Sequence, residues 1–285
     1  MRIYNMTGYS LIVLHVLTAG LLAPPGWGVG LGAAVAFLYL VFVWLVGGVY
    51  LSDVLHLGIA HGALDYRPGF VTFITLLANT AAVYVNPVTW VDRHRNHHAF
   101  ADHPGDPNKR HGDGLWKTLW LCFAPYPCGT NLATDAIFRT WPFHLVSSSS
   151  FALLSPLSSY GLLWLVARDW AFALALWLGV RALGLWINMV QNYWTHDRRF
   201  GTRRYADEQD NATNVHDWLP VTASFSACLQ NNHHHAPAFL RTSHDPAEYD
   251  FGFLTVRVMK AMGLVRATST GAEKPAGIRL QEVGF

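Results

Sequence analysis

The sequence predicts an all-helical integral membrane protein, with four transmembrane helices in two hairpins and a cytoplasmic helical cap. Three observations support this fold class. Hydrophobic residues make up 52% of the 285-residue chain and charged residues only 13%, about half the share usual in soluble proteins. No Asp, Glu, Lys or Arg occurs between Arg2 and Asp53. The chain also has 15 histidines, and most of them lie in short clusters.

The first predicted hairpin occupies the uncharged N-terminal stretch, which Pro24-Pro25-Gly26 divides in two. A cleaved signal peptide would be followed by a polar domain, whereas a second apolar run follows here. A second hairpin turns at Arg168-Asp169 and contains one interior charge, Arg181. Each run is long enough to cross the hydrocarbon core as a helix. The predicted spans are residues 7–23, 29–52, 145–167 and 170–194.

The distribution of basic residues predicts the topology. Lys and Arg are concentrated after Asp53 and after His196, so both termini and the segments 53–144 and 195–266 are expected to be cytoplasmic. A weaker apolar run at 70–85 is interpreted as a buried interfacial helix, because a fifth span would move the next histidines to the other side. An amphipathic surface helix is expected at 115–123. We treat residues 1–285 as one domain with a polar tail at 267–285.

Four histidine clusters follow the predicted spans. His94, His97 and His98 have the spacing i, i+3, i+4, which places side chains on one helix face. His56 and His61 are five residues apart and would diverge somewhat on an α-helix. The remaining clusters contain Asn192 and His196, which share a face, and the run Gln230-Asn231-Asn232-His233-His234-His235.

So many imidazoles exceed the coordination number of one metal ion, and two metals are therefore implied. Imidazole ligands suit iron, copper, zinc and nickel. A transporter or metal sensor is a second possibility, but it would place ionisable ligands inside the spans. The net charge of +2 gives no reason to expect nucleic-acid binding, and three cysteines at wide spacings predict neither a disulfide framework nor a cysteine zinc site.

At this point the sequence resembles the membrane-bound fatty acyl desaturases, over residues of about 49–237. The likeness includes HLGIAH from His56, LANT from Leu77 and the run W-x-x-x-HRNHH from Trp90. It continues with Asp106-Pro107 and ends with NNHHHAP from Asn231. The resemblance implies a non-haem di-iron centre that itself does the chemistry, with no separate acid or base. The implied ligands are His56, His61, His94, His97, His98, His196, His233 and His234, with Asn192 linked through water.

One position departs from the family pattern. The last box of the family begins with a histidine where this chain has Gln230. Three alternatives stay open: Gln230 is a weaker oxygen ligand, it holds a water, or His235 substitutes after a one-residue shift. The departure also keeps open other oxidations on the same scaffold, namely hydroxylation, acetylenic bond formation and decarboxylation to a terminal alkene.

The resemblance further implies dioxygen as co-substrate and an acyl lipid or acyl thioester as substrate. A separate ferredoxin- or cytochrome-type donor with its reductase would supply electrons. The basic runs Arg198–Arg204 and Lys109-Arg110 are candidate docking sites, but they are better explained as positive-inside topology signals. The short chain fits a bacterial inner-membrane enzyme. Acidic residues expected to orient the imidazoles are Asp92, Asp102, Asp106, Asp197 and Asp217. Candidates for the lining of an acyl tunnel are Trp90, Trp186, Trp116 and Phe70.

Overall fold

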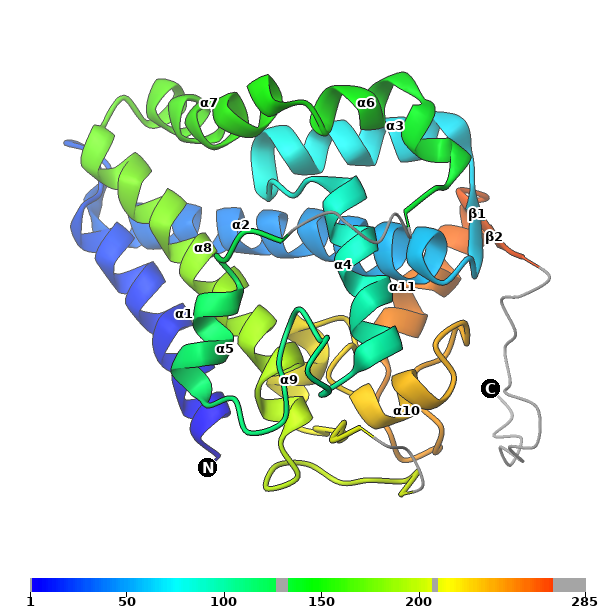
Figure 1. Ribbon diagram of the computed structural model, residues 1–285. Coiled ribbons are helices and arrows are strands. Elements are labelled where there is room, and N and C mark those ends of the chain that lie inside the picture. Colours follow the sequence, from blue (N-terminus) through cyan, green and yellow to red (C-terminus); the bar gives the residue numbers. More distant parts are fainter. Residues whose placement is uncertain (1, 127–132, 207–209, 269–285) are drawn as a thin grey trace.

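The membrane part of the chain consists of long apolar helices. The computed structural model describes residues 2–126, 133–206 and 210–268. Within these residues, three helices are long and apolar enough to cross a membrane: Gly28–Ala60, Ser149–Ala167 and Trp170–His196. In Figure 1 they correspond to α2 (Gly28–Gly48) with its continuation, α7 (Ser149–Ala167), and α8 (Trp170–Asn192) with its continuation. Three of the four predicted spans therefore have matching helices of this kind.

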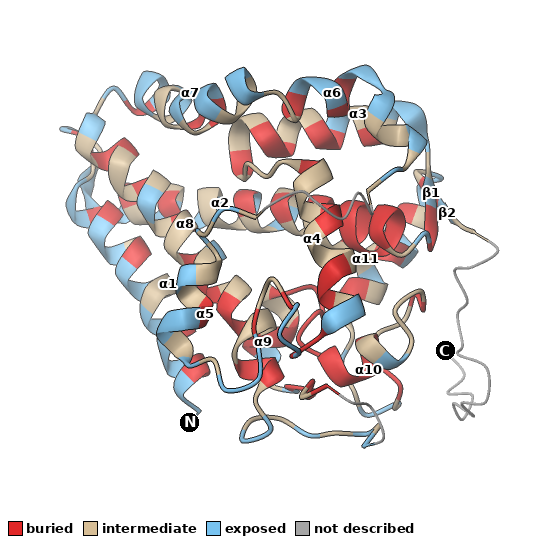
Figure 2. Cartoon of the chain, viewed as in Figure 1, coloured by how far each residue is buried: buried red, intermediate tan, exposed pale blue. Residues whose placement is uncertain are grey.

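The remaining predicted span, 7–23, corresponds to α1 (Ile3–Leu21), which is not among those three helices. Helix α1 packs against both α2 and α8. Its outer face is nonetheless apolar, because Val13, Leu14 and Leu17 are all more than half exposed. Figure 2 shows the outward faces of α1 and α7 as largely exposed. Apolar faces of this extent are expected where lipid, and not water, is the surrounding solvent.

Helix α2 changes its hydrogen-bond pattern as it approaches the histidines. It continues without a break into the π-helix η1 (Val49–Ala60). The amide of His61 closes the pattern by donating to the carbonyl oxygen of His56 at 3.1 Å. Because a π-helix bonds residues i and i+5, the five-residue spacing of these histidines matches one turn. The divergence predicted for an α-helix is thereby removed.

Two close approaches accompany the wide π-helix. Tyr66 lies against Gly58, and its hydroxyl donates to the carbonyl oxygens of Asp53 at 2.8 Å and Val54 at 3.1 Å. The ring of Phe225 lies against Gly48 at the start of the segment. A Cβ atom at either glycine would overlap these rings. Glycine is therefore required at both positions by packing.

A Gly58→Ala variant is expected to lower the melting temperature of the detergent-solubilised protein by about 4–12 °C. The added methyl group displaces Tyr66, which costs about 2–3 kcal/mol in overpacking and lost hydrogen bonds. The matched control is Gly69→Ala, because a Cβ at Gly69 meets nothing within 4 Å. Equal melting temperatures for the two variants would show that the contact with Tyr66 does not constrain η1.

A bent pair of helices carries the central histidine cluster. The first arm is α3 (Pro68–Leu77) with the π-helical η2 (Ala78–Ala82), and the second is α4 (Pro87–Phe100). The two arms meet at 96°, and only together are they long and apolar enough to cross a membrane. The first arm matches the buried helix predicted at 70–85, since Val71, Ile74 and Ala78 are all buried. Pro87 begins α4, and Asn86 caps it by accepting from the amide of Thr89.

The remaining elements are short. Helix α5 (Leu115–Leu121) matches the predicted surface helix, with Trp116 and Trp120 exposed. One feature corrects the all-helical prediction: β1 (Leu64–Tyr66) pairs antiparallel with β2 (Val265–Ala267). Strands of three residues are too short to show an alternating pattern in the sequence. The other elements are η3 (Ala136–Arg139), α6 (Trp141–Val146), η4 (Trp194–His196), α9 (Trp218–Ala223), α10 (Gln230–His235) and α11 (Phe251–Ala261). Most of the predicted tail at 267–285 lies outside the described residues.

The elements that carry the clustered histidines come together in a buried region of the protein. In Figure 1, η1, α4 and α10 lie near one another, with α8 reaching the same region from the other end. Figure 2 shows η1 as the most continuously buried segment, and every residue from Asp53 to Ala60 is buried. Asp53 and His56 are the two polar side chains of this segment, and their burial indicates that they have partners within the protein.

Candidate metal centre

Eight histidines form two neighbouring groups, and these are the eight histidines that the family resemblance implies as ligands. Within each group, one nitrogen from every ring lies within 4.8 Å of the others, which is close enough to share a metal ion. Ring centroids of the two groups approach to 4.6 Å at His98 and His234. The five-histidine group contains His56, His61, His94, His98 and His233, and the three-histidine group contains His97, His196 and His234.

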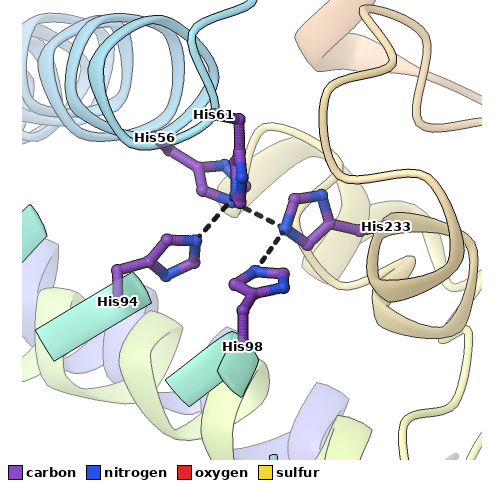
Figure 3. A group of neighbouring side chains, drawn as sticks. All are labelled: His56, His61, His94, His98 and His233. Carbon is purple, nitrogen blue, oxygen red and sulfur yellow. Dashed lines mark hydrogen bonds between the residues drawn. The ribbon is translucent and has the colours of Figure 1, made fainter. Parts of the chain in front are cut away.

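The five-histidine group is drawn in Figure 3. His56 and His61 extend from η1 and its end, while His94 and His98 extend from α4. His233 approaches from α10. The Nε2 atoms of His56 and His233 are 2.9 Å apart, those of His61 and His94 are 2.9 Å apart, and those of His98 and His233 are 3.0 Å apart. Nitrogens packed so closely need a proton between each pair or a common cation.

The three-histidine group has a different surrounding. Each ring contacts a carboxylate through Nδ1: His97 contacts Asp106 at 2.9 Å, His196 contacts Asp102 at 2.9 Å, and His234 contacts Asp210 at 2.6 Å. A carboxylate partner keeps the proton on Nδ1 and leaves a lone pair on Nε2. All three Nε2 atoms are buried and have no hydrogen-bond partner within the part of the chain that the structure describes. Such lone pairs fit a metal ion, which is the usual use of a carboxylate-bonded histidine.

The carboxylates behind the three-histidine group are ionised, which strengthens their contacts with the imidazoles. Burial by itself would raise the pKa of Asp102, but His196, the amide of Asn211 and Lys109 lower that pKa well below its usual range. Burial likewise opposes ionisation of Asp210, yet the contact with His234 lowers its pKa to about 2. Asp102 adopts a left-handed backbone with φ of 63°, a conformation in which Asp is more common than most residues. Both carboxylates are therefore ionised at neutral pH.

Lys109 completes the outer part of this group. Its ammonium donates to the carbonyl oxygen of His196 at 2.9 Å and lies 3.7 Å from Asp102. Lys109 is buried, so it is unsuited to the predicted docking of an electron donor. The sequence predicts Lys109 in a basic surface run, whereas its ammonium is directed inward.

Only some of the acidic residues predicted to orient imidazoles contact a histidine in the structure. Asp106 and Asp102 contact histidines as described above, and Asp92 is buried on α4. Asp197 pairs with the exposed Arg199, and Asp217 accepts hydrogen bonds from Tyr4 and Asn5 of α1. Asp210 was missed, because it lies in a loop 24 residues before its histidine and no motif marks it.

Two further candidates, Asn192 and His235, make other contacts. The side-chain amide of Asn192 donates to the carbonyl and side-chain oxygens of Asn188 at 2.9 and 3.1 Å. His235 is exposed and stacks on Tyr205 with ring centroids 3.6 Å apart. The structure therefore does not bring His235 into either group, which disfavours the one-residue shift of the last cluster.

The four aromatic candidates for an acyl tunnel occupy different environments. Trp90 stacks on His94 with centroids 5.1 Å apart, and Phe70 packs against the core near η1. Trp186 is buried and donates to the carbonyl oxygen of Tyr4, whereas Trp116 is 77% exposed. A cavity of about 10 Å³ touches His56, Phe225 and His233, which is about the space of one water. The acyl tunnel itself stays a prediction.

A buried histidine outside both groups, His244, lies in the segment between α10 and α11. The Nδ1 atom of His244 and the Tyr205 hydroxyl are hydrogen-bonded at 2.9 Å, and the His244 Nε2 atom is buried with no hydrogen-bond partner among the described residues. Burial, followed by the charges of Arg204 and His235, lowers the pKa of His244 to about 4. The folded state therefore binds this proton less readily than the unfolded state, in which the pKa is about 6.5.

Acidification is expected to destabilise the protein partly through His244. The stability that its neutral form provides is complete above pH 6.5 and is lost as the pH falls toward 4. Between pH 6.5 and 5 this loss amounts to at most about 2 kcal/mol. Thermal unfolding measured at both pH values should show a smaller difference for His244→Gln than for the unchanged protein. An identical difference would mean that His244 does not titrate in this range.

Together, the fold and the site define a helical membrane protein with a histidine cluster that is compatible with metal binding. No family model matches the sequence. The chain is 27% identical to an sn-1 stearoyl-lipid 9-desaturase of Anabaena variabilis, covering 81% of this chain and 82% of the relative. It is 24% identical to Delta-9 acyl-lipid desaturase 1 of Arabidopsis thaliana, covering 78% and 71%. A hex-5-enoyl-[acyl-carrier protein] acetylenase of Moorena producens is also 24% identical, covering 79% and 74%. With the histidine clusters, these similarities support the membrane-bound fatty acyl desaturase family for this chain.

Proposed function

We propose that this protein is an oxygen-dependent desaturase that introduces a cis double bond into a long-chain acyl lipid. The observation that carries this function is the pair of histidine groups, in a chain whose relatives are named acyl-lipid desaturases. The balanced reaction converts two adjacent methylenes, dioxygen, two electrons and two protons into the double bond and two waters. The acyl chain is oxidised and dioxygen is reduced.

Two iron ions are the proposed cofactor. The fit rests on the orphaned Nε2 atoms of the three-histidine group and on the close Nε2 pairs of the five-histidine group. Imidazole-rich sites suit iron. When bound, the irons would supply the activation of dioxygen that removal of two hydrogens from an unactivated chain requires. The proposed ligands are His56, His61, His94, His97, His98, His196, His233 and His234.

The protein's own groups have positioning tasks. Asp102, Asp106 and Asp210 hold protons on the Nδ1 atoms and keep the Nε2 lone pairs directed inward. Trp90 packs over the ring of His94 and limits its rotation. No side chain needs to act as a general acid or base toward the acyl chain. Binding would instead orient the chain and exclude water from the reacting carbons.

The proposed topology has four spans, α1, α2, α7 and α8, in one domain over residues 1–285. Both termini, the cap and the histidine groups lie on the cytoplasmic side. The concentration of Lys and Arg after Asp53 and after His196 supports this orientation. The bent pair of α3 and α4 then lies beside the cap. The similarity to bacterial relatives supports the inner membrane of a bacterium as the location.

Electrons are proposed to come from a separate ferredoxin- or cytochrome-type protein with its reductase. Since Lys109 is buried, the segment Arg198–Arg204 is the better docking candidate. The guanidinium side chain of Arg199 is 73% exposed beside Asp197. Surface charge of this kind mainly raises the association rate of an acidic partner.

Product analysis tests the function. Bacterial cells that express the chain under air should contain a new cis-monounsaturated acyl chain, detected by gas chromatography–mass spectrometry. Cells with the empty vector, and expressing cells grown without oxygen, should lack it. An acetylenic product is the alternative that the similarity to the Moorena acetylenase favours. A hydroxy acid or terminal alkene would instead indicate another oxidation, and unchanged lipids despite added donor and reductase would contradict the proposal.

A further inference from the structure

Asp53 is a buried acidic residue on η1 that the proposed metal site does not use. The residue is 0% exposed and lies three positions before His56 in the same uninterrupted helix. Its Oδ2 atom is 3.0 Å from the hydroxyl of Thr255 on α11. Its Oδ1 atom is buried and has no hydrogen-bond partner in the part of the chain that the structure describes. An ionised carboxylate here would be buried without a cation or enough donors to compensate its charge, which is a costly form of burial.

Helix α11 gives this carboxyl group a fixed neighbour. Asp250 caps the helix by accepting a hydrogen bond from the amide of Phe253 at 2.9 Å. A Cβ atom at Gly252 would overlap the backbone carbonyl of Phe225, so the first turn of α11 is closely packed. The carboxylate of Asp250 repels a second negative charge at Asp53. The start of α11 therefore favours a neutral partner on η1.

The hydrogen bonds of Thr255 indicate where the proton lies. Its hydroxyl oxygen is 2.7 Å from the carbonyl oxygen of Gly252 and 3.0 Å from Oδ2 of Asp53. A hydroxyl group has one hydrogen to donate, and a backbone carbonyl can only accept. The Thr255 hydrogen therefore goes to the nearer carbonyl, and the contact with Asp53 needs a hydrogen from the carboxyl group. Tyr66 supplies none, because its hydroxyl donates to the backbone carbonyl of Asp53.

We propose that Asp53 is a protonated carboxylic acid that donates to Thr255 and thereby holds η1 against α11. The hydrogen bond joins two helices that are far apart in the sequence, close to the point where η1 presents His56. Asp53 is thus a positioning residue that acts through His56. This positioning role rests on the proposed metal site, whereas the protonation of Asp53 does not.

Infrared spectroscopy tests the protonation directly. The carbonyl stretch of a protonated carboxyl group is separate from the bands of ionised carboxylates. Metal-free protein in detergent at about pH 8, where ordinary carboxyl groups are ionised, should show this band, and Asp53→Asn should lack it. The control is Asp65→Asn, which should keep the band, because Asp65 is exposed and pairs with Arg266. Absence of the band from the unchanged protein, or its persistence in Asp53→Asn, would overturn the proposal.

Thermal unfolding and metal binding test the positioning role. Asp53→Asn keeps a neutral donor of similar size, so it should unfold at the same temperature and bind Co²⁺ as tightly as the unchanged protein in equilibrium dialysis. Asp53→Leu lacks the donor and should lower the melting temperature by at least about 4 °C. It should also bind Co²⁺ about tenfold more weakly. Should Asp53→Leu fail to fold, Thr255→Val removes the acceptor on α11 and should show the same two losses.

The pattern of losses decides the role of Asp53. Equal losses in Asp53→Asn and Asp53→Leu would show that the residue acts as a charged carboxylate, which would overturn the proposal. A lower melting temperature with unchanged Co²⁺ affinity in Asp53→Leu or Thr255→Val would overturn the positioning of His56. If the unchanged protein binds no Co²⁺, the proposed metal site is contradicted together with the positioning role, and the infrared band still decides the protonation of Asp53.

Discussion

A His97→Ala variant is expected to lose more than about 99% of the new unsaturated product. His97 is one of only three imidazoles in the smaller group, and it is 2% exposed. Loss of a hydrogen-bonding partner behind a ligand already reduces metal affinity or activity by about 10–100-fold, so loss of the imidazole itself should cost more. The ratio of unsaturated to saturated acyl chains and the iron content per chain are the measurements.

The matched control is His144→Ala. His144 lies on α6, is exposed and belongs to neither histidine group. It should retain both the product ratio and the iron content. Comparable product from His97→Ala at equal expression would exclude His97 from the metal site. If product is lost while iron is fully retained, His97 would be a structural residue and not a ligand.

An Asp106→Asn variant is expected to bind metal about 10–100-fold more weakly. Asp106 is fully buried and receives the Nδ1 contact of His97 as well as the amides of Asp102 and Asn108. An asparagine keeps the size of the side chain but removes the charge and places an NH₂ group among donors. The His97 ring then loses the partner that fixes its Nδ1 proton. Iron affinity, measured by dialysis against a competing chelator, reports the change.

Activity of Asp106→Asn should recover partly when iron is added in excess, since the ligand itself is still present. The control is Asp197→Asn, whose carboxylate pairs with the exposed Arg199. That variant should bind iron as the unchanged protein does. Unchanged affinity in Asp106→Asn, or equal losses in both variants, would remove Asp106 from the metal site.

Much of the architecture could be predicted because apolar length is a local property. The predicted runs at 29–52, 145–167 and 170–194 each correspond to a long apolar helix. The surface helix near Leu115 was predicted from its amphipathic pattern and is present. The pairing of Leu64 with Ala267 was not predictable, because it joins two very short segments about 200 residues apart.

In the site too, features set by nearby residues in the sequence could be predicted, whereas features set by contacts between distant residues could not. The spacing in HRNHH indicates a shared helix face, and α4 has that form. The five-residue spacing of His56 and His61 required a π-helix, which depends on contacts such as that of Tyr66 with the carbonyl oxygen of Asp53. Asp210 depends on a loop that folds back toward His234. Neither dependence leaves a periodic signal in the sequence.

The uninterrupted helix from Gly28 to Ala60 has a mechanical consequence. Its 33 residues extend at most about 50 Å, while the hydrocarbon core is about 30 Å thick. The helix is therefore long enough to carry His56 beyond the hydrocarbon core while its first part remains in lipid. Because a bilayer of different thickness changes the tilt of a span, we expect the rate of the proposed reaction to depend on the thickness of the bilayer in which it is measured.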